Sequence, residues 1–449
     1  MRKNVFVSLV VLFAFLLASC APAAAPAEEA PAAEAPAEEA PAAEAPAEEA
    51  PAEEAPVCTP KVCEDTPLTA MPVADIEAVC AADDYGCAVI NAGQTIKIGM
   101  GSPMTGGDAT FGIDAEQSGK IAVADACTLA GFQFELIAED DTGTAEGGAA
   151  VANKFVADPT IIGVAGHLFS GATFAAAPIY EEAGIVMLSP SATNPDLTKQ
   201  GFRVFNRVPF TDQMQGTAAA EYLYNTLGFR KVVFLHDSQD YGKGLAEIAA
   251  ARFEELGGEA VEVLGITSKE ADYSPVLTTI AAKNPEAIYF GGYTQDAGVL
   301  TNNMKTTGLE NAVFFGCDGT FGTDYLNRTG VNGEGSYHAT PRTPPATPEK
   351  LNFDACYTEA YGMGPGELSP FTWNSYDTTT AISEKVKEVA MLGDDGSLYI
   401  PRGALVDGVR GLTNWTGISG TYTCAPVGDC NVEGPQFWVV QNGEFVAAN

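Results

Sequence analysis

Short apolar runs alternate with longer stretches of helical spacing along most of this chain of 449 residues. A short apolar run that ends in a glycine-rich or polar turn predicts a buried strand, and apolar positions three and four apart predict an amphipathic helix. The predicted strands lie at 96–100, 132–138, 161–165, 185–188, 231–235, 261–265 and 287–290, and the predicted helices at 116–130, 145–157, 212–227, 244–256 and 273–283. This alternation predicts an α/β fold with parallel sheets and right-handed crossovers.

The beginning of the chain has a different pattern. Arg2 and Lys3 precede an apolar stretch at 5–17, and Leu17-Ala18-Ser19-Cys20 follows, which is the order of a secretory signal with a small-residue cleavage site. A signal anchor retained as a membrane helix is the alternative, but a span needs about 20 apolar residues. We therefore expect a signal peptide at 1–19 and a lipid on Cys20, which would anchor the chain on the extracytoplasmic side of a membrane.

Residues 21–56 repeat alanine, proline and glutamate and contain no aromatic or basic side chain. Such a segment cannot bury a core, so we expect 20–56 to be the acylated cysteine and a disordered tether. The tether holds 10 of the chain's 59 acidic residues, and the others still outnumber the 23 Lys and Arg. This charge argues against a nucleic-acid partner.

The chain has ten cysteines, and an exported protein can oxidise them. Four lie in a short extension at 57–93 (Cys58, Cys63, Cys80 and Cys87), and two bracket a turn near the C-terminus (Cys424 and Cys430). We take these six as disulfide candidates with undetermined pairing, while Cys127, Cys317 and Cys356 have no obvious scheme. Zinc binding by the first four is the alternative, but their spacing is looser than that of structural zinc sites.

Two turns directly after apolar runs carry the clearest candidate chemistry. Gly166-His167-Leu168-Phe169-Ser170 follows one run, and Ser189-Pro190-Ser191-Ala192-Thr193 follows the next. In open α/β sheets, ligands bind just beyond the carboxyl ends of the strands. Hydroxyl and backbone N–H groups gathered there suit a carboxylate, although Ser170 and Thr193 would also serve as ordinary helix caps.

From about residue 95 to the C-terminus the chain resembles the leucine/isoleucine/valine-binding proteins of bacterial ABC importers, in lipoprotein form. The resemblance is densest at five ordered stretches, namely 96–99, 166–198, 236–245, 289–293 and 373–376. It implies a type I periplasmic binding protein, with two Rossmann-like lobes joined by three crossing segments near Asp212, Thr340 and Gly417. Lobe 1 would then comprise 94–211 plus 341–417, and lobe 2 would comprise 212–340 plus 418–449.

The same resemblance implies roles for particular residues. Ser170, Ser191 and Thr193 would bind the α-carboxylate of an amino acid, and Asp318 would receive its ammonium, with Asp212 as a second acidic candidate. Aromatic and apolar neighbours would complete the site, namely Tyr241, Tyr293, Phe111, Leu168 and Phe169. Asp318 stands where the leucine/isoleucine/valine-binding proteins have the longer Glu. Phe169 stands where they have a small cysteine, and its bulky ring puts a preference for branched-chain ligands in doubt.

Catalysis finds little support in the sequence. The three histidines have no nucleophile elbow beside them, and the loop at 99–107 has neither a Walker lysine nor a dinucleotide fingerprint. We therefore expect no enzyme, no cofactor and no metal. The favoured hypothesis is a monomeric solute-binding lipoprotein that captures an amino acid, branched-chain or otherwise apolar or small, and delivers it to an ABC permease. The alternative is a receptor lipoprotein that signals through a separate membrane partner.

Overall fold

The computed structural model describes residues 57–431 and 433–448 and contains two seven-stranded sheets. The expectations for 1–56, including Cys20, lie outside the described residues. The first sheet has the order β1 (Asp65–Thr66), β5 (Thr128–Leu129), β6 (Phe132–Asp140), β4 (Ile96–Ser102), β7 (Ile161–Val164), β8 (Val186–Ser189) and β9 (Phe205–Arg207). Its strands from β6 to β9 pair in parallel, as the alternating pattern predicts.

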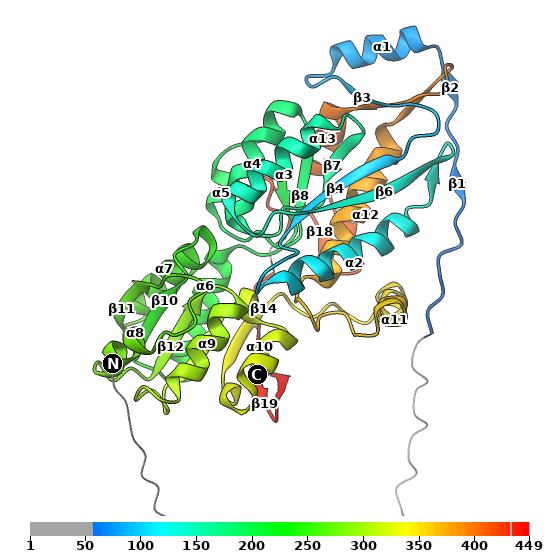
Figure 1. Cartoon of the computed structure of the whole chain (residues 1–449). Coiled ribbons are helices and arrows are strands. Elements are labelled where there is room, and N and C mark those ends of the chain that lie inside the picture. The colour runs from blue at the N-terminus through cyan, green and yellow to red at the C-terminus, as the bar shows by residue number, and fades with distance from the viewer. Residues whose placement is uncertain (1–56, 432, 449) are drawn as a thin grey trace, which may run out of the picture. The chain divides into compact units, whose positions relative to one another are not determined.

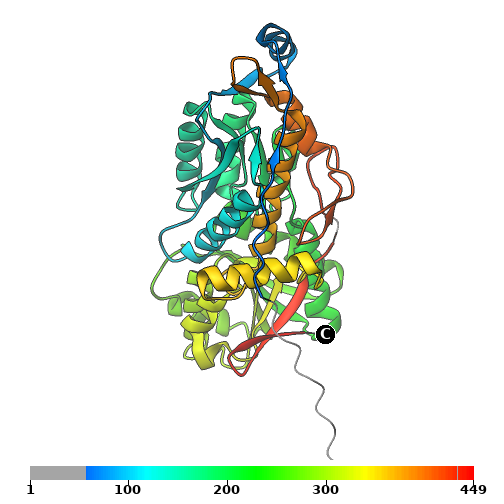
Figure 2. The ribbon, with the colours of Figure 1, turned by 90° about the vertical axis from the view of Figure 1, so that its right-hand side faces the viewer.

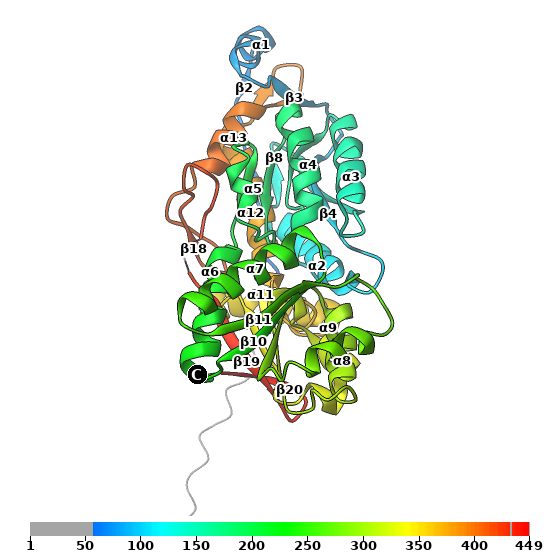
Figure 3. The ribbon, with the colours of Figure 1, turned by 90° about the vertical axis from the view of Figure 1, so that its left-hand side faces the viewer.

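Helices cover both faces of this first sheet (Figures 1 and 3). On one face α3 (Ala145–Ala157) packs against α4 (Ser170–Ala183), with α5 (Asp196–Lys199) beside it, and on the other α2 (Ala109–Asp125) packs against α12 (Thr372–Val389), with α13 (Arg402–Arg410) beside it. The strands between them are buried on both sides: Ile98, Val164, Val186 and Leu188 have no exposed surface. This double covering explains why these strands read as continuous apolar runs.

The second sheet has the order β11 (Glu259–Gly265), β10 (Lys231–His236), β12 (Ala287–Gly291), β13 (Val313–Gly316), β14 (Tyr337–Thr340), β19 (Gln436–Gln441) and β20 (Glu444–Ala447). Strands β11 to β14 are parallel, whereas β19 and β20 pair antiparallel at the edge. Helices α6 (Asp212–Glu221) and α7 (Asp240–Glu255) pack together on one face, and α8 (Ser274–Ala281), α9 (Thr294–Met304) and α10 (Thr323–Thr329) on the other (Figure 3). Two Rossmann-like α/β lobes are therefore present, as expected.

Two predicted helices differ from the structure more than the others do. The helix expected at 116–130 is α2, which begins at Ala109 and ends at Asp125. Cys127 and Ala130 have positive φ angles, so the chain turns there and Leu129 enters the core from the short strand β5 instead. The helix expected at 212–227 ends as an α-helix at Glu221 and continues as one π-helical turn over Tyr222–Thr226.

The cysteine-rich extension is an ordered strap on the first lobe (dark blue in Figure 2). It contributes α1 (Val73–Ala82), and its strands β2 (Ala70–Met71) and β3 (Cys87–Ile90) join β15 (Met391–Gly393) and β16 (Leu398–Pro401) in a small sheet. Disulfides Cys58–Cys356 and Cys63–Cys127 tie it to α11 (Pro348–Tyr361) and to the end of α2, and Cys80–Cys87 closes a local loop. Cys356 and Cys127, for which the sequence indicated no pairing, are thus the disulfide partners of the strap cysteines Cys58 and Cys63. Cys317 is buried and has no disulfide partner among the described residues.

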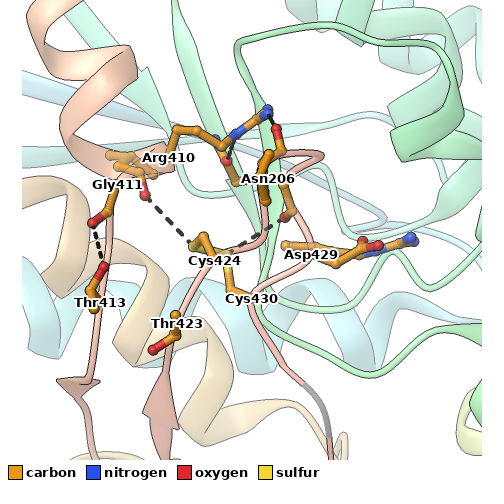
Figure 4. Close-up of a disulfide and its surroundings, with 12 residues drawn as sticks. Asn206, Arg410, Gly411, Thr413, Thr423, Cys424, Asp429 and Cys430 are labelled. Atoms are coloured by element: carbon orange, nitrogen blue, oxygen red, sulfur yellow. Dashed lines mark hydrogen bonds and ion pairs between the residues drawn. A yellow bond between two sulfur atoms is a disulfide. The ribbon is translucent and has the colours of Figure 1, made fainter.

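The third crossing between lobes lies later than predicted. Residues after Gly417 remain on the first lobe, where β17 (Trp415–Thr416) pairs with β18 (Thr421–Tyr422), and the candidates Cys424 and Cys430 form a local disulfide (Figure 4). Backbone bonds from Cys430 to Arg207 and from Arg207 to Gly428 hold this turn beside β9. The chain returns to the second sheet only at Gln436, so the boundary predicted near Gly417 is wrong by more than ten residues. The boundary predicted near Asp212 lies between β9 of the first sheet and β10 of the second, and the boundary predicted near Thr340 lies at the end of β14.

Candidate binding site between the lobes

Eight of the ten predicted site residues line one cavity at the carboxyl ends of the parallel strands. Leu168, Phe169, Ser170 and Ser191 follow β7 and β8, Tyr241, Tyr293 and Asp318 follow β10, β12 and β13, and Phe111 lies on α2. Gly319 and Phe371 complete the lining. The remaining two predicted residues, Thr193 and Asp212, are buried beside the cavity rather than in its lining. The structure thus brings the two predicted turns of the first lobe to face the second lobe.

Ser170 and Ser191 form the polar part of the first-lobe wall. Ser170 is the first residue of α4, so its hydroxyl lies among the free N–H groups of that helix, and it accepts a hydrogen bond from the Asn194 N–H at 3.3 Å. The Ser191 hydroxyl donates to the Leu168 carbonyl at 2.7 Å, which fixes one turn against the other. A helix N-terminus with hydroxyls beside it is a ready anion site.

A group of buried polar side chains lies where the two lobes meet: Thr193, Asp212, Gln215 and Asp318. The backbone joins Thr193 to Asp212, whose N–H donates to the Thr193 carbonyl at 2.9 Å, and Gln215 accepts from the Asp318 N–H at 3.3 Å. Yet several of their atoms have no hydrogen-bond partner among the described residues, namely Thr193 Oγ1, both Asp212 carboxylate oxygens, Gln215 Nε2 and Asp318 Oδ2. Buried polar atoms normally find partners, so this cluster is built to receive a polar group.

Asp318 is held toward the cavity from two sides. Tyr241 donates its hydroxyl hydrogen to Asp318 Oδ1, and the Gly319 N–H donates to the same oxygen at 2.8 Å. Burial raises the pKa of Asp318 to about 6, against the lowering effect of these hydrogen bonds. Burial, and then the nearby charge of Asp318, raises the pKa of Asp212 well above its usual value. Two neighbouring buried carboxyl groups would be stabilised by a cation between them.

Aromatic rings fill the rest of the site. Phe169 from the first lobe stacks on Tyr293 from the second, with ring centroids 4.0 Å apart and an interplanar angle of 13°. Phe111 meets both rings edge-on, at 5.7 Å from Phe169 and 6.3 Å from Tyr293, and Tyr241 lies 5.3 Å from Tyr293. These rings close an apolar compartment next to the polar wall, and they join the two lobes.

Other contacts hold the lobes together around the cavity. Asp108, at the start of α2, accepts from the Thr294 hydroxyl at 3.3 Å and from the Gln295 N–H at 3.4 Å, both at the N-terminus of α9. Asn194 donates its side-chain amide to the Asp240 carbonyl at 2.7 Å. The cleft is therefore closed, with the first and second lobes bonded to each other on two sides of the site.

His167, singled out by its position in the first turn, lies behind the site. Its ring is fully buried, with Nδ1 2.7 Å from an Asp141 carboxylate oxygen and Nε2 3.0 Å from the Tyr180 hydroxyl. Asp141 has no exposed surface, because its carboxylate binds His167 and accepts a hydrogen bond from the Gly143 N–H at 2.9 Å. The histidine thus anchors the turn that carries Leu168, Phe169 and Ser170. In the part of the chain that the structure describes, no three metal-ligating side chains gather.

The sequence reasoning missed Phe371, Gly319 and Gln215. Phe371 precedes α12 and reaches the cavity from a distant part of the chain, and no local pattern marks it. Gly319 had a readable signal, since it follows Asp318 directly. A Cβ on Gly319 would come within 2.5 Å of the Gly292 carbonyl oxygen, so the close approach of these two loops requires glycine.

Comparison with known proteins agrees with this geometry. Residues 95–429 match the model of the family described as periplasmic binding protein. An amino acid binding protein of Pseudomonas aeruginosa is 33% identical over 291 residues, 64% of this chain and 77% of that protein. A Leu/Ile/Val/Thr-binding protein of Salmonella typhimurium is 30% identical over 330 residues, 71% of this chain and 87% of that protein. The solved structure of a leucine binding protein LivK from Thermotoga maritima aligns with a TM-score of 0.70 and 27% identity, covering 79% of this chain and 98% of that one.

The family match includes every residue of the cavity lining and all strands of the two seven-stranded sheets except β1, β19 and β20. The similar proteins are named for what they bind, and none of these names denotes an enzyme. From the two α/β lobes, the cavity between them and the extent of these matches, we conclude that this chain belongs to the periplasmic binding protein family, with similarity to its leucine/isoleucine/valine-binding members.

Proposed function

We propose that this protein captures an α-amino acid between its two lobes and delivers it to an ABC permease. One observation carries the proposal: the same cavity has hydroxyl groups and a helix N-terminus on one side and, on the other, a buried carboxylate oxygen that has no hydrogen-bond partner among the described residues. An α-amino acid carries a carboxylate and an ammonium on the same carbon, so one small molecule satisfies both walls.

The assignment of groups follows from charge. The ligand carboxylate would lie at the N-terminus of α4, bound by Ser170 and Ser191, with the Thr193 hydroxyl behind them. The ligand ammonium would lie against Asp318 Oδ2, with Asp212 as the second acidic neighbour. Each charged group of the ligand would then exchange its bound water for fixed hydrogen-bonding groups of the protein, as a buried ion requires. Phe111, Leu168, Phe169, Tyr241 and Tyr293 would surround the α-carbon and side chain.

A lipid-anchored location would suit delivery to a transporter. We propose an acylated Cys20, a tether at 20–56 and a strap-bearing first lobe (57–93, 94–211 and 341 to about 430) that works against a second lobe (212–340 and about 436–448). Lipid attachment would keep the binding lobes near the permease on the extracytoplasmic side, as a monomer. Within residues 57–431 and 433–448, no helix has both the length and the apolar character needed to cross a bilayer.

A thermal-shift screen followed by calorimetry tests the proposal. The full chain, purified in detergent, is titrated with the amino acids and with matched compounds that lack one charged group, namely small carboxylates and small amines. We expect stabilisation by one or a few α-amino acids and none by either control set, because each control leaves one buried wall unpaired. Stabilisation by carboxylates without an amine, equal to that by amino acids, contradicts the proposal.

A further inference from the structure

The cavity is almost filled by side chains of the protein itself. Its volume is about 10 Å³, room for roughly one water molecule. The stacked rings of Phe169 and Tyr293 line this cavity beside the hydroxyl groups of Ser170 and Ser191. Any bound amino acid must therefore move these rings or the lobes that carry them, and a larger side chain must move them further.

The first-lobe ring has little room to move outward. A Cβ on Gly143 would come within 2.7 Å of the Phe169 ring, so the ring already rests on the backbone behind it, and Gly143 has a φ of +66° that side chains rarely adopt. Pro103 lies against the same position. Phe169 itself is 6% exposed, which leaves no solvent-facing pocket into which its ring can swing.

The second-lobe ring is held in the same way. A Cβ on Gly319 would come within 3.1 Å of the Tyr293 ring and within 3.0 Å of the Tyr241 ring. Tyr293 is also in contact with Phe111, which is 2% exposed. Rings that pack on backbone from both lobes form a rigid wall, and well-packed rigid walls discriminate by ligand size.

We propose that the aromatic wall of Phe169 and Tyr293 restricts the site to α-amino acids with small side chains, of the size of glycine, alanine or serine, and that Phe169 is the specificity-determining residue. The inference rests on the proposed function, since it presupposes an α-amino acid in the cavity. A leucine side chain adds four heavy atoms to the ligand backbone, and the closed cleft lined by the Phe169 ring has no free volume for them.

Calorimetry with glycine, alanine, valine and leucine tests this inference on the full chain in detergent. We compare the native protein with Phe169→Ala and Phe169→Leu, and with Phe174→Ala as a matched control, because Phe174 lies on the same helix α4 outside the cavity. We expect the native protein to bind glycine or alanine at least tenfold more tightly than leucine. Both Phe169 variants should reduce that ratio, Phe169→Ala by at least tenfold, and Phe174→Ala should leave it unchanged.

Three results overturn the inference. Leucine binding to the native protein within threefold of alanine, or more tightly, removes the size restriction. An unchanged alanine-to-leucine ratio in both Phe169 variants, each shown to be folded by its melting curve, removes Phe169 as the determinant. If no α-amino acid gives a heat of binding with any of the proteins, the proposed function is overturned and the inference with it. This result differs from the other two, which are changes in a ratio of measured affinities.

Discussion

The Tyr241 hydroxyl donates a hydrogen bond to one carboxylate oxygen of Asp318, and this bond aims the other oxygen, which has no partner among the described residues, at the cavity. Tyr241 follows β10 and Asp318 follows β13, so the pair also joins two loops of the second lobe. The second lobe thus presents a fixed, buried negative charge to whatever the first lobe binds.

Asp318→Asn should weaken amino-acid binding strongly, because the amide keeps the shape of the side chain but loses the charge that pairs with an ammonium. Hydrogen bonds to charged groups contribute about 1.5–3 kcal/mol, so the dissociation constant should rise at least tenfold. Calorimetry measures it. Asp324→Asn, on α10 and outside the cavity lining, is the matched control and should bind normally. Equal affinity of the native protein and the Asp318 variant would remove Asp318 from the site.

The affinity should also depend on pH through Asp318. Burial raises its pKa from the ordinary 3.8 to about 6 in the unliganded protein. Below pH 6 the carboxyl group is protonated and must lose that proton to pair with an ammonium, so affinity should fall by up to about tenfold per pH unit below 6. Calorimetry between pH 4.5 and 7.5 measures this slope, and Asp318→Asn should flatten it.

The stability of the unliganded protein should change in the opposite direction over this range. Because the folded state holds the Asp318 proton more tightly than the unfolded state does, it binds more protons between pH 4 and 6, and the contribution of this group to stability falls as the pH rises. Denaturant unfolding of native protein and Asp318→Asn at pH 5 and 7 measures the difference. A native protein that loses no stability relative to the variant on going from pH 5 to 7 contradicts the raised pKa.

The strap disulfide Cys63–Cys127 should stabilise the fold more than the local disulfide Cys424–Cys430 near the C-terminus. Cys63 and Cys127 are 64 residues apart, whereas Cys424 and Cys430 are 6 apart, and a cross-link restricts the unfolded chain more when it closes a longer loop. The expected losses are about 4 kcal/mol for Cys63→Ser with Cys127→Ser and about 2 kcal/mol for Cys424→Ser with Cys430→Ser. Denaturant midpoints compare the two double variants. A larger loss of stability on removal of Cys424–Cys430 would show that packing in the folded state, and not the entropy of the unfolded chain, determines how much each disulfide contributes.

The sequence predicted the parallel sheets and most of the site because both rest on local patterns. Apolar runs buried on two faces mark β7 and β8, and the hydroxyl turns after them hold Ser170 and Ser191. What it could not predict depends on distant packing. Phe371, just before α12, reaches the cavity from a position about 200 residues after Phe169. The turn at Cys430 stays on the first lobe because Arg207 binds Asp429 at 2.7 Å. No periodicity carries such information.

The contact between Asp108 and the start of α9 should favour the closed state. The Asp108 carboxylate accepts from the Thr294 hydroxyl and the Gln295 N–H, at the positive end of that helix dipole, and it is buried only when the lobes meet. Asp108→Ala removes this bond without touching the cavity lining, so it should shift the population toward the open form and raise the dissociation constant about threefold to tenfold. Small-angle scattering without ligand should show a larger radius of gyration than in the native protein, and saturating amino acid should restore the native value. Asp196→Ala, on an exposed part of the first lobe, should change neither quantity. Weaker binding with an unchanged radius would mean that Asp108 acts on the ligand and not on closure.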